Sequence, residues 1–229
     1  NNTTGGPVHI VGSDPNAKIL AGMRVIYGKG ISFDELMAYP TSQLGTEYWF
    51  PFYNHNNVNL DSELRIANTS NTTAATVEIY IGGVLKDTTT IQPLSAYLKS
   101  FPGFSGGPVR VVSTNSINLV ASLRLLYKNA KNKNTYSELM GVPTAQLSND
   151  YWLPYYKNNT TDTDSQIRFT NTSPTLTTTV TVYIGANTAP VYTKVLTPSS
   201  ADRVSLAGIT GGPIRIFGSD PSAKILAGM

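Results

Sequence analysis

The 229-residue sequence contains no cysteine and only two histidines, His9 and His55. The lack of cysteine excludes disulfide bonds, thiolate metal sites and a cysteine nucleophile. Neither histidine has a second histidine at the spacing that metal sites use, and no pairing of a nucleophile with a base is recognisable. The sequence therefore predicts a protein that is not an enzyme and needs no cofactor.

Charge and long apolar runs are also scarce. Charged residues make up 14% of the sequence, against roughly 25% in ordinary soluble domains. No apolar run approaches the ~18–20 residues that a membrane-spanning helix needs, so we expect no membrane insertion. The one basic cluster, Lys128, Lys131 and Lys133, lies among asparagines without stacking aromatics, which argues against nucleic-acid binding.

Internal repetition is the strongest positive signal in the sequence. Four pairs of segments share an offset of 103 residues and similar sequences: 48–53 and 151–156, 62–70 and 165–173, 78–82 and 181–185, 33–37 and 136–140. A Gly-Gly-Pro signature occurs three times, beginning at Gly5, Gly106 and Gly211. In addition, residues 12–23 return as residues 218–229 with one change, Asn16 to Ser222. We infer tandem domains with a period of about 100–105 residues.

Within each unit, apolar and polar residues alternate with period two, which is typical of half-buried strands. Examples are Val77, Ile79 and Ile81 in the first unit and Val180, Val182 and Ile184 in the second. Six or seven short antiparallel strands in ~100 residues are typical of an immunoglobulin-like β-sandwich. The predicted fold class is all-β, with two such sandwiches in tandem.

The predicted domains are a terminal hairpin with its connector at 1–47, a first sandwich at 48–147 and a second sandwich at 148–229 with a clipped last strand. Each connector also contains a capping-box pattern, at 32–35 and at 135–138. A proline follows each pattern and would stop a helix. We therefore expect one short capped helix in each connector.

The chain begins with the final strands of a unit, residues 7–27, and no earlier strands with which they could pair. An isolated hairpin is marginally stable and exposes pairing edges. The sequence leaves two explanations open: a segment of a longer tandem array, or terminal strands that complete a neighbouring subunit by strand addition. Either explanation predicts end-to-end assembly with copies of the same unit. The residues predicted to form the assembly strands are Val8, Ile10, Ile19, Ala21, Met23, Ile214, Ile216, Ile225, Ala227 and Met229.

Several of these motifs are similar to a repeat of large bacterial cell-surface and extracellular proteins. The matching residues are Trp152, Pro154 and Tyr156; Ile167, Arg168 and Asn171; Val77, Tyr80, Ile81, Gly82 and Gly83; Phe101, Pro102 and Gly103; Gly107 to Ser113; and Ala121, Ser122 and Arg124. The resemblance covers nearly the whole chain. It implies surface arrays and fibres at an extracellular or cell-surface location, and it carries no established chemistry.

Three kinds of candidate binding site remain. A flat aromatic surface for sugar stacking competes with core packing at Tyr48, Trp49, Tyr151 and Trp152. A weak calcium site competes with a solvated turn at Asp162 and Asp164. Glycosylation sequons occur at Asn68, Asn71, Asn158, Asn159 and Asn171.

The sequence favours a non-enzymatic structural subunit of an extracellular filament or cell-surface array. An adhesin or carbohydrate-binding module that uses the aromatic strand is the main alternative. A domain pair appended to an enzyme elsewhere is a third hypothesis.

Overall fold

The computed structural model describes residues 5–14, 16–56, 58–128, 134–159 and 163–229, and it is all-β. All strand pairings among these residues are antiparallel. Helical structure in this part of the chain is limited to two 3-10 turns, η1 (Thr41–Gln43) and η2 (Thr144–Gln146). A search of the described residues found no helix with the length and hydropathy to span a membrane.

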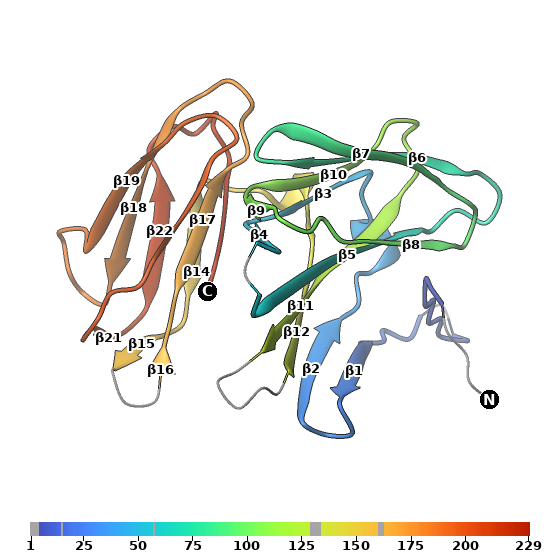
Figure 1. The fold of residues 1–229 in the computed structure, drawn as a ribbon, viewed down its shortest axis with the longest axis horizontal. Coiled ribbons are helices and arrows are strands. Elements are labelled where there is room, and N and C mark those ends of the chain that lie inside the picture. Colours follow the sequence, from blue (N-terminus) through green and yellow to red (C-terminus); the bar gives the residue numbers. More distant parts are fainter. Residues whose placement is uncertain (1–4, 15, 57, 129–133, 160–162) are drawn as a thin grey trace.

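The first unit places two sheets on either side of one hydrophobic cluster (Figure 1). One sheet has the order β13-β3-β10-β6-β7 and the other β12-β11-β5-β8, with a small β4-β9 pair beside them. The bounds are β3 (Glu47–Phe50), β4 (Tyr53–Asn54), β5 (Leu60–Asn68), β6 (Ala75–Ile81), β7 (Val84–Ile91), β8 (Ala96–Lys99), β9 (Ser105–Gly106), β10 (Val109–Ser113), β11 (Leu119–Lys128), β12 (Asn134–Met140) and β13 (Val142–Pro143).

The second unit repeats this plan around a second cluster (Figure 1). Its main sheets have the orders β14-β22-β18-β19 and β20-β17-β23, and β16-β15-β21 forms a small third sheet. The bounds are β14 (Asp150–Leu153), β15 (Tyr156–Asn159), β16 (Thr163–Asp164), β17 (Ile167–Asn171), β18 (Thr178–Ile184), β19 (Tyr192–Leu196), β20 (Ala201–Val204), β21 (Thr210–Gly211), β22 (Ile214–Gly218) and β23 (Ile225–Gly228).

The period-two pattern forms strands as predicted. In β6, Val77, Ile79 and Ile81 are buried while the residues between them are half-exposed. The same alternation holds along β18. Each strand therefore contributes one apolar face to the cluster of its unit.

The predicted capped helices are wrong. Residues 32–37 form β2 (Ser32–Met37), which pairs over six residues with β1 (Gly22–Tyr27), and residues 135–138 lie within β12. A capping box supplies partners for only two amides, and a helix of so few residues is unstable by itself. A continuous strand ladder satisfies more backbone hydrogen-bonding groups than one helical turn, so these residues form strands.

The predicted hairpin at 7–27 is also wrong in its pairing. The strand that follows Gly-Gly-Pro, β10, and the next strand, β11, lie in opposite sheets, because each buries its apolar face against the same cluster from a different side. In the described N-terminal residues, 7–21 belong to no named strand. The hairpin that forms is β1–β2.

The N-terminal segment and the two units contact one another at equivalent positions. A Cβ atom on Gly107 would lie 3.2 Å from Cβ of Ala201, and one on Gly6 would lie 3.8 Å from Cβ of Ala96. Gly6 and Gly107 hold the same place in the Gly-Gly-Pro signature, and the two alanines begin the equivalent strands β8 and β20. The N-terminal Gly-Gly-Pro segment thus sits on the first unit as its counterpart sits on the second.

Candidate functional site

The N-terminal segment exposes apolar side chains that the same sequence buries elsewhere in the chain. Ile19 and Leu20 are 54% and 86% exposed, whereas Ile225 and Leu226 in the repeated sequence are 0% and 3% exposed. The local turn before them is the same in both copies: Ala17 N donates to Asp14 O (3.1 Å), as Ala223 N donates to the equivalent oxygen (3.2 Å). The two copies differ in their surroundings, because β23 pairs with β17 and residues 19–21 pair with no named strand of the described chain.

The other predicted assembly residues are likewise mostly exposed in the N-terminal segment and mostly buried in the second unit. Val8, Ile10 and Met23 are exposed, and Ala21 is half-buried. Ile214 and Ile216 are buried in β22 within the second cluster. Ala227 packs against that cluster and Met229 is exposed.

The β1–β2 hairpin is attached to the first unit by side chains. Ser32 Oγ accepts from the backbone N–H of Tyr136 at 2.8 Å, and Asp34 Oδ2 accepts from that of Glu138 at 2.5 Å. The Tyr27 ring stacks on the Tyr136 ring with centroids 5.8 Å apart. As Figure 1 shows, β2 lies beside the edge strand β12, whose N–H groups it caps with polar side chains.

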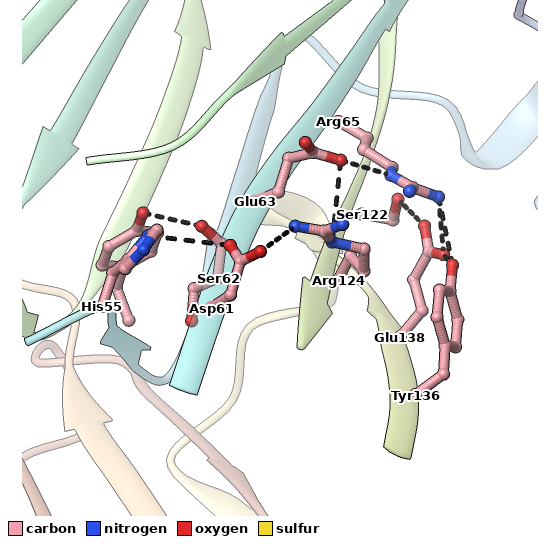
Figure 2. A network of polar contacts seen from close by, with 10 residues as sticks. His55, Asp61, Ser62, Glu63, Arg65, Ser122, Arg124, Tyr136 and Glu138 are labelled. Atoms are coloured by element: carbon pink, nitrogen blue, oxygen red, sulfur yellow. Dashed lines mark hydrogen bonds and ion pairs between the residues drawn. The ribbon is translucent and has the colours of Figure 1, made fainter. Parts of the chain in front are cut away.

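A row of alternating charges crosses β5, β11 and β12 beside this attachment (Figure 2). Arg124 contacts Asp61 at 3.0 Å and Glu63 at 3.7 Å, and Glu63 contacts Arg65 at 3.1 Å. Arg65 Nη1 also lies 3.1 Å from Oε2 of Glu138. Each carboxylate thus neutralises a neighbouring guanidinium across the strands.

Glu138 is the most buried member of this network. Its carboxylate accepts from Arg65 and from the hydroxyls of Ser122 and Tyr136 (Figure 2). Burial, together with the hydrogen bond to Glu138, raises the pKa of Tyr136 to about 12. Burial acts to lower the pKa of Arg65, but Glu138, Glu63 and Tyr136 together outweigh it and the pKa is raised. The network holds β12 to the unit through ion pairs and hydrogen bonds.

The two tryptophans have different environments although their strands are equivalent. Trp49 is 7% exposed: its backbone pairs with Val142, and its Nε1 donates to Thr144 Oγ1 at 2.9 Å. Trp152 is 60% exposed. Among the described residues, β14 pairs only with β22, so no strand covers Trp152 as β13 covers Trp49.

This difference divides the predicted sugar-stacking residues. Tyr48 and Trp49 are buried, and Tyr48 OH donates to Leu119 O at 2.8 Å, so the prediction is wrong for these two residues. Large aromatics gain more from burial in the cluster than from an exposed surface. Tyr151 is half-buried and donates to Ile225 O at 3.1 Å. Only Trp152 of the four presents a large exposed face.

Two predicted glycosylation sites are also wrong. Asn68 is buried, and its Nδ2 donates to Thr73 O at 2.8 Å and to Ile91 O at 3.0 Å. Asn171 is equally buried and its Nδ2 donates to three backbone carbonyls. The amide nitrogens that a glycan would require close a loop in each unit instead.

The remaining sequons and the calcium candidates also differ in their exposure and in their contacts. Asn158 is buried and its Nδ2 donates to Asp164 Oδ1 at 2.9 Å, which excludes a glycan there. Asn71 is exposed and Asn159 is half-buried, so glycosylation of these two stays a prediction. Asp162 lies outside the described residues, within which no cluster of metal-ligating side chains is found.

Sequence reasoning missed Glu138 and the seam between β2 and β12. The repeat aligns Glu35 with Glu138, and the alternation of Tyr136 and Glu138 was a usable period-two signal. His55, also outside the predicted sites, has Nδ1 at 3.8 Å from Asp61 Oδ1, beyond hydrogen-bond distance.

Comparison with known proteins gives no match to a protein family, to a curated protein or to a solved structure.

Proposed function

We propose that this protein is a structural subunit of an extracellular filament or cell-surface array, built from two immunoglobulin-like sandwiches at 48–147 and 148–229. Subunits associate end to end by strand exchange. Residues 8–23 of one copy take the positions that residues 214–229 hold in the second unit of another copy.

One observation carries the proposal: residues 12–23 and 218–229 have nearly the same sequence, but the apolar side chains of the first copy are exposed and those of the second are mostly buried. Burial of the exposed apolar side chains in the N-terminal segment is favourable by about 25 cal/mol per Å². The exchange releases an equivalent apolar surface at residues 214–229, so it is nearly balanced in burial and the added contacts between copies decide it. Ile19 and Leu20 have a ready burial site in the second unit, where Ile225 and Leu226 already fit the same sequence. Exchange therefore needs no new packing solution, only an equivalent segment from a second copy.

The contacts between units support a repeating assembly. Gly6 lies beside Ala96 as Gly107 lies beside Ala201. A second unit from another copy placed on this surface would bring its Gly212, the third member of the signature, to the same position. The arrangement of two units within one chain would then continue from chain to chain. Such head-to-tail contacts build a closed ring or an open filament.

Light scattering over a range of protein concentrations tests the proposal. The wild-type chain should form species well above its 24.7 kDa mass as concentration rises. Leu20→Asp should stay monomeric, because the exchange would bury an unpaired carboxylate. Val58→Asp, at an exposed residue far along the chain, is the control and should assemble like wild type. A wild-type chain that stays at 24.7 kDa, or a Leu20→Asp variant that assembles normally, contradicts the proposal.

Binding of glycans is the second candidate function, and the exposed faces of Trp152 and Tyr155 favour it. Stacking on a sugar would protect Trp152 from acrylamide quenching in dilute protein. A glycan that gives this protection in wild type but not in Tyr155→Ala would support binding. No response across a glycan panel would exclude it.

A further inference from the structure

We propose that the surface of the second unit around Trp152, Leu153 and Arg168 binds residues 35–41 of a second copy of this chain. The inference rests on the proposed function, since it names the part of the partner that each exchanged strand brings with it. Residues 35–41 begin within β2, the strand that follows the exchanged segment and β1 in the chain. They correspond in the repeat to residues 138–144, which cover the equivalent surface of the first unit.

The first unit shows how its own connector covers the equivalent tryptophan. Val142 pairs with Trp49 in the ladder of β13 with β3, and Thr144 Oγ1 accepts from Trp49 Nε1 and donates to Glu47 at 2.9 Å. The repeat places Tyr39 and Thr41 of the N-terminal connector at these two positions. In the second unit, Trp152 and Asp150 are the residues they would meet.

A matched change in side-chain size supports this pairing. Gly141 lies against the Phe50 ring, where an added Cβ would be 2.7 Å from Cζ and would clash. In the second unit Phe50 is replaced by the smaller Leu153, and Gly141 corresponds to Ala38 in the N-terminal connector. The glycine faces the large ring, and the alanine would face the smaller side chain.

Charge gives an independent argument. Arg65 is paired with Glu138 in the first unit. Its counterpart Arg168 forms no ion pair within the described part of the chain; it lies over the Phe52 ring at 4.4 Å. Burial lowers the pKa of Arg168, and the nearby Arg203 lowers it further. Glu35, the counterpart of Glu138, is exposed, and in a second copy it would supply the missing carboxylate.

Tryptophan quenching reads out the predicted contact. The chain has two tryptophans and Trp49 is already buried, so the acrylamide-accessible fluorescence should come from Trp152, as a Trp152→Phe variant verifies. Under conditions in which the wild-type chain associates, this accessible fraction should fall at least about twofold, in step with the rise in mass. Association with unchanged quenching overturns the inference and leaves the proposed function standing. Absence of any association overturns both.

A size exchange tests the site itself. Leu153→Phe should weaken association about tenfold or more, because Ala38 of the partner would clash with the larger ring. Ala38→Gly in the same chain should restore association, since it recreates the pairing of Phe50 with Gly141. Ala38→Gly alone is the control and should associate to within about threefold of wild type. Thermal unfolding verifies that the Leu153→Phe variant is folded. Normal association of that folded variant, or no rescue by Ala38→Gly, overturns the inference.

Discussion

At the scale of single residues, the repeat provides matched pairs whose environments differ. Glu35 and Glu138 are equivalent in sequence, yet Glu35 is exposed with Arg24 as its partner, whereas Glu138 is buried among three donors. A buried carboxylate that satisfies several donors contributes more to stability than an exposed ion pair. The two glutamates therefore allow the value of burial to be measured within one chain.

Glu138→Gln should destabilise the first unit by about 1–2 kcal/mol, because it removes the charge that faces Arg65 and two hydroxyl donors. Glu35→Gln should change stability by less than about 0.5 kcal/mol in dilute protein. Urea unfolding followed by Trp49 fluorescence in a Trp152→Phe background measures both. Equal effects of the two substitutions would show that the network does not stabilise the unit.

Buried tyrosines make the first unit sensitive to high pH. Burial raises the pKa of Tyr48, Tyr53 and Tyr136 from 10.0 to about 12. The folded state then keeps protons that the unfolded state loses, so stability should be constant below about pH 9 and should fall as pH rises from about 10 toward 12, by up to roughly 2 kcal/mol per tyrosine. Urea midpoints at a series of pH values test this. Tyr48→Phe should flatten the decline, and no decline up to pH 12 would contradict it.

At the scale of strands, one short sequence illustrates how much burial depends on partners. Leu226, in β23 beside β17, is 3% exposed, and Leu20, outside any named strand, is 86% exposed. Local turn chemistry is the same in both copies. Tertiary context alone therefore decides whether this sequence forms a buried strand.

Leu226→Ala should destabilise the protein by about 2–4 kcal/mol, since it leaves a cavity in place of a nearly fully buried side chain. Leu20→Ala should leave the stability of dilute protein within about 0.5 kcal/mol of wild type. Thermal unfolding of the two variants side by side gives the comparison. A large loss of stability in Leu20→Ala would mean that the N-terminal segment is already packed in the single molecule.

The strands were predictable from sequence to different degrees. The alternation in β6 and β18 gave their type and their buried faces, because period two is a direct consequence of strand geometry. The capping-box patterns misled, since a four-residue motif carries no information on the β1 and β11 segments that pair with β2 and β12. The placement of β10 and β11 in opposite sheets could not be derived either, because alternation is the same whichever side of the core a strand covers.

The candidate site was predictable only in outline. The surplus of strand residues at the N-terminus pointed to Ile19 and its neighbours, and these are exposed. The exposure of Trp152 was not predictable, because its sequence context closely resembles that of Trp49. What differs is that β13 covers Trp49 while no described strand covers Trp152, and this depends on contacts some 100 residues apart in the sequence.

At the scale of the whole molecule, the N-terminal segment and the two units form a series of similar contacts. The first two Gly-Gly-Pro segments each approach the first residue of β8 or its counterpart β20, Gly6 beside Ala96 and Gly107 beside Ala201. Arg168 under Phe52 adds a second contact between the units. The N-terminal segment therefore meets the first unit much as the first unit meets the second.

Hydrogen exchange of two nearly identical peptides tests the central claim most directly. Peptides 12–23 and 218–229 differ only at Asn16 and Ser222, so mass spectrometry distinguishes them. In dilute protein, peptide 218–229 should be protected and peptide 12–23 should exchange freely. In concentrated protein, peptide 12–23 should become protected while 218–229 loses protection to a similar extent. Equal protection in dilute protein, or a peptide 12–23 that exchanges freely at every concentration, would contradict strand exchange.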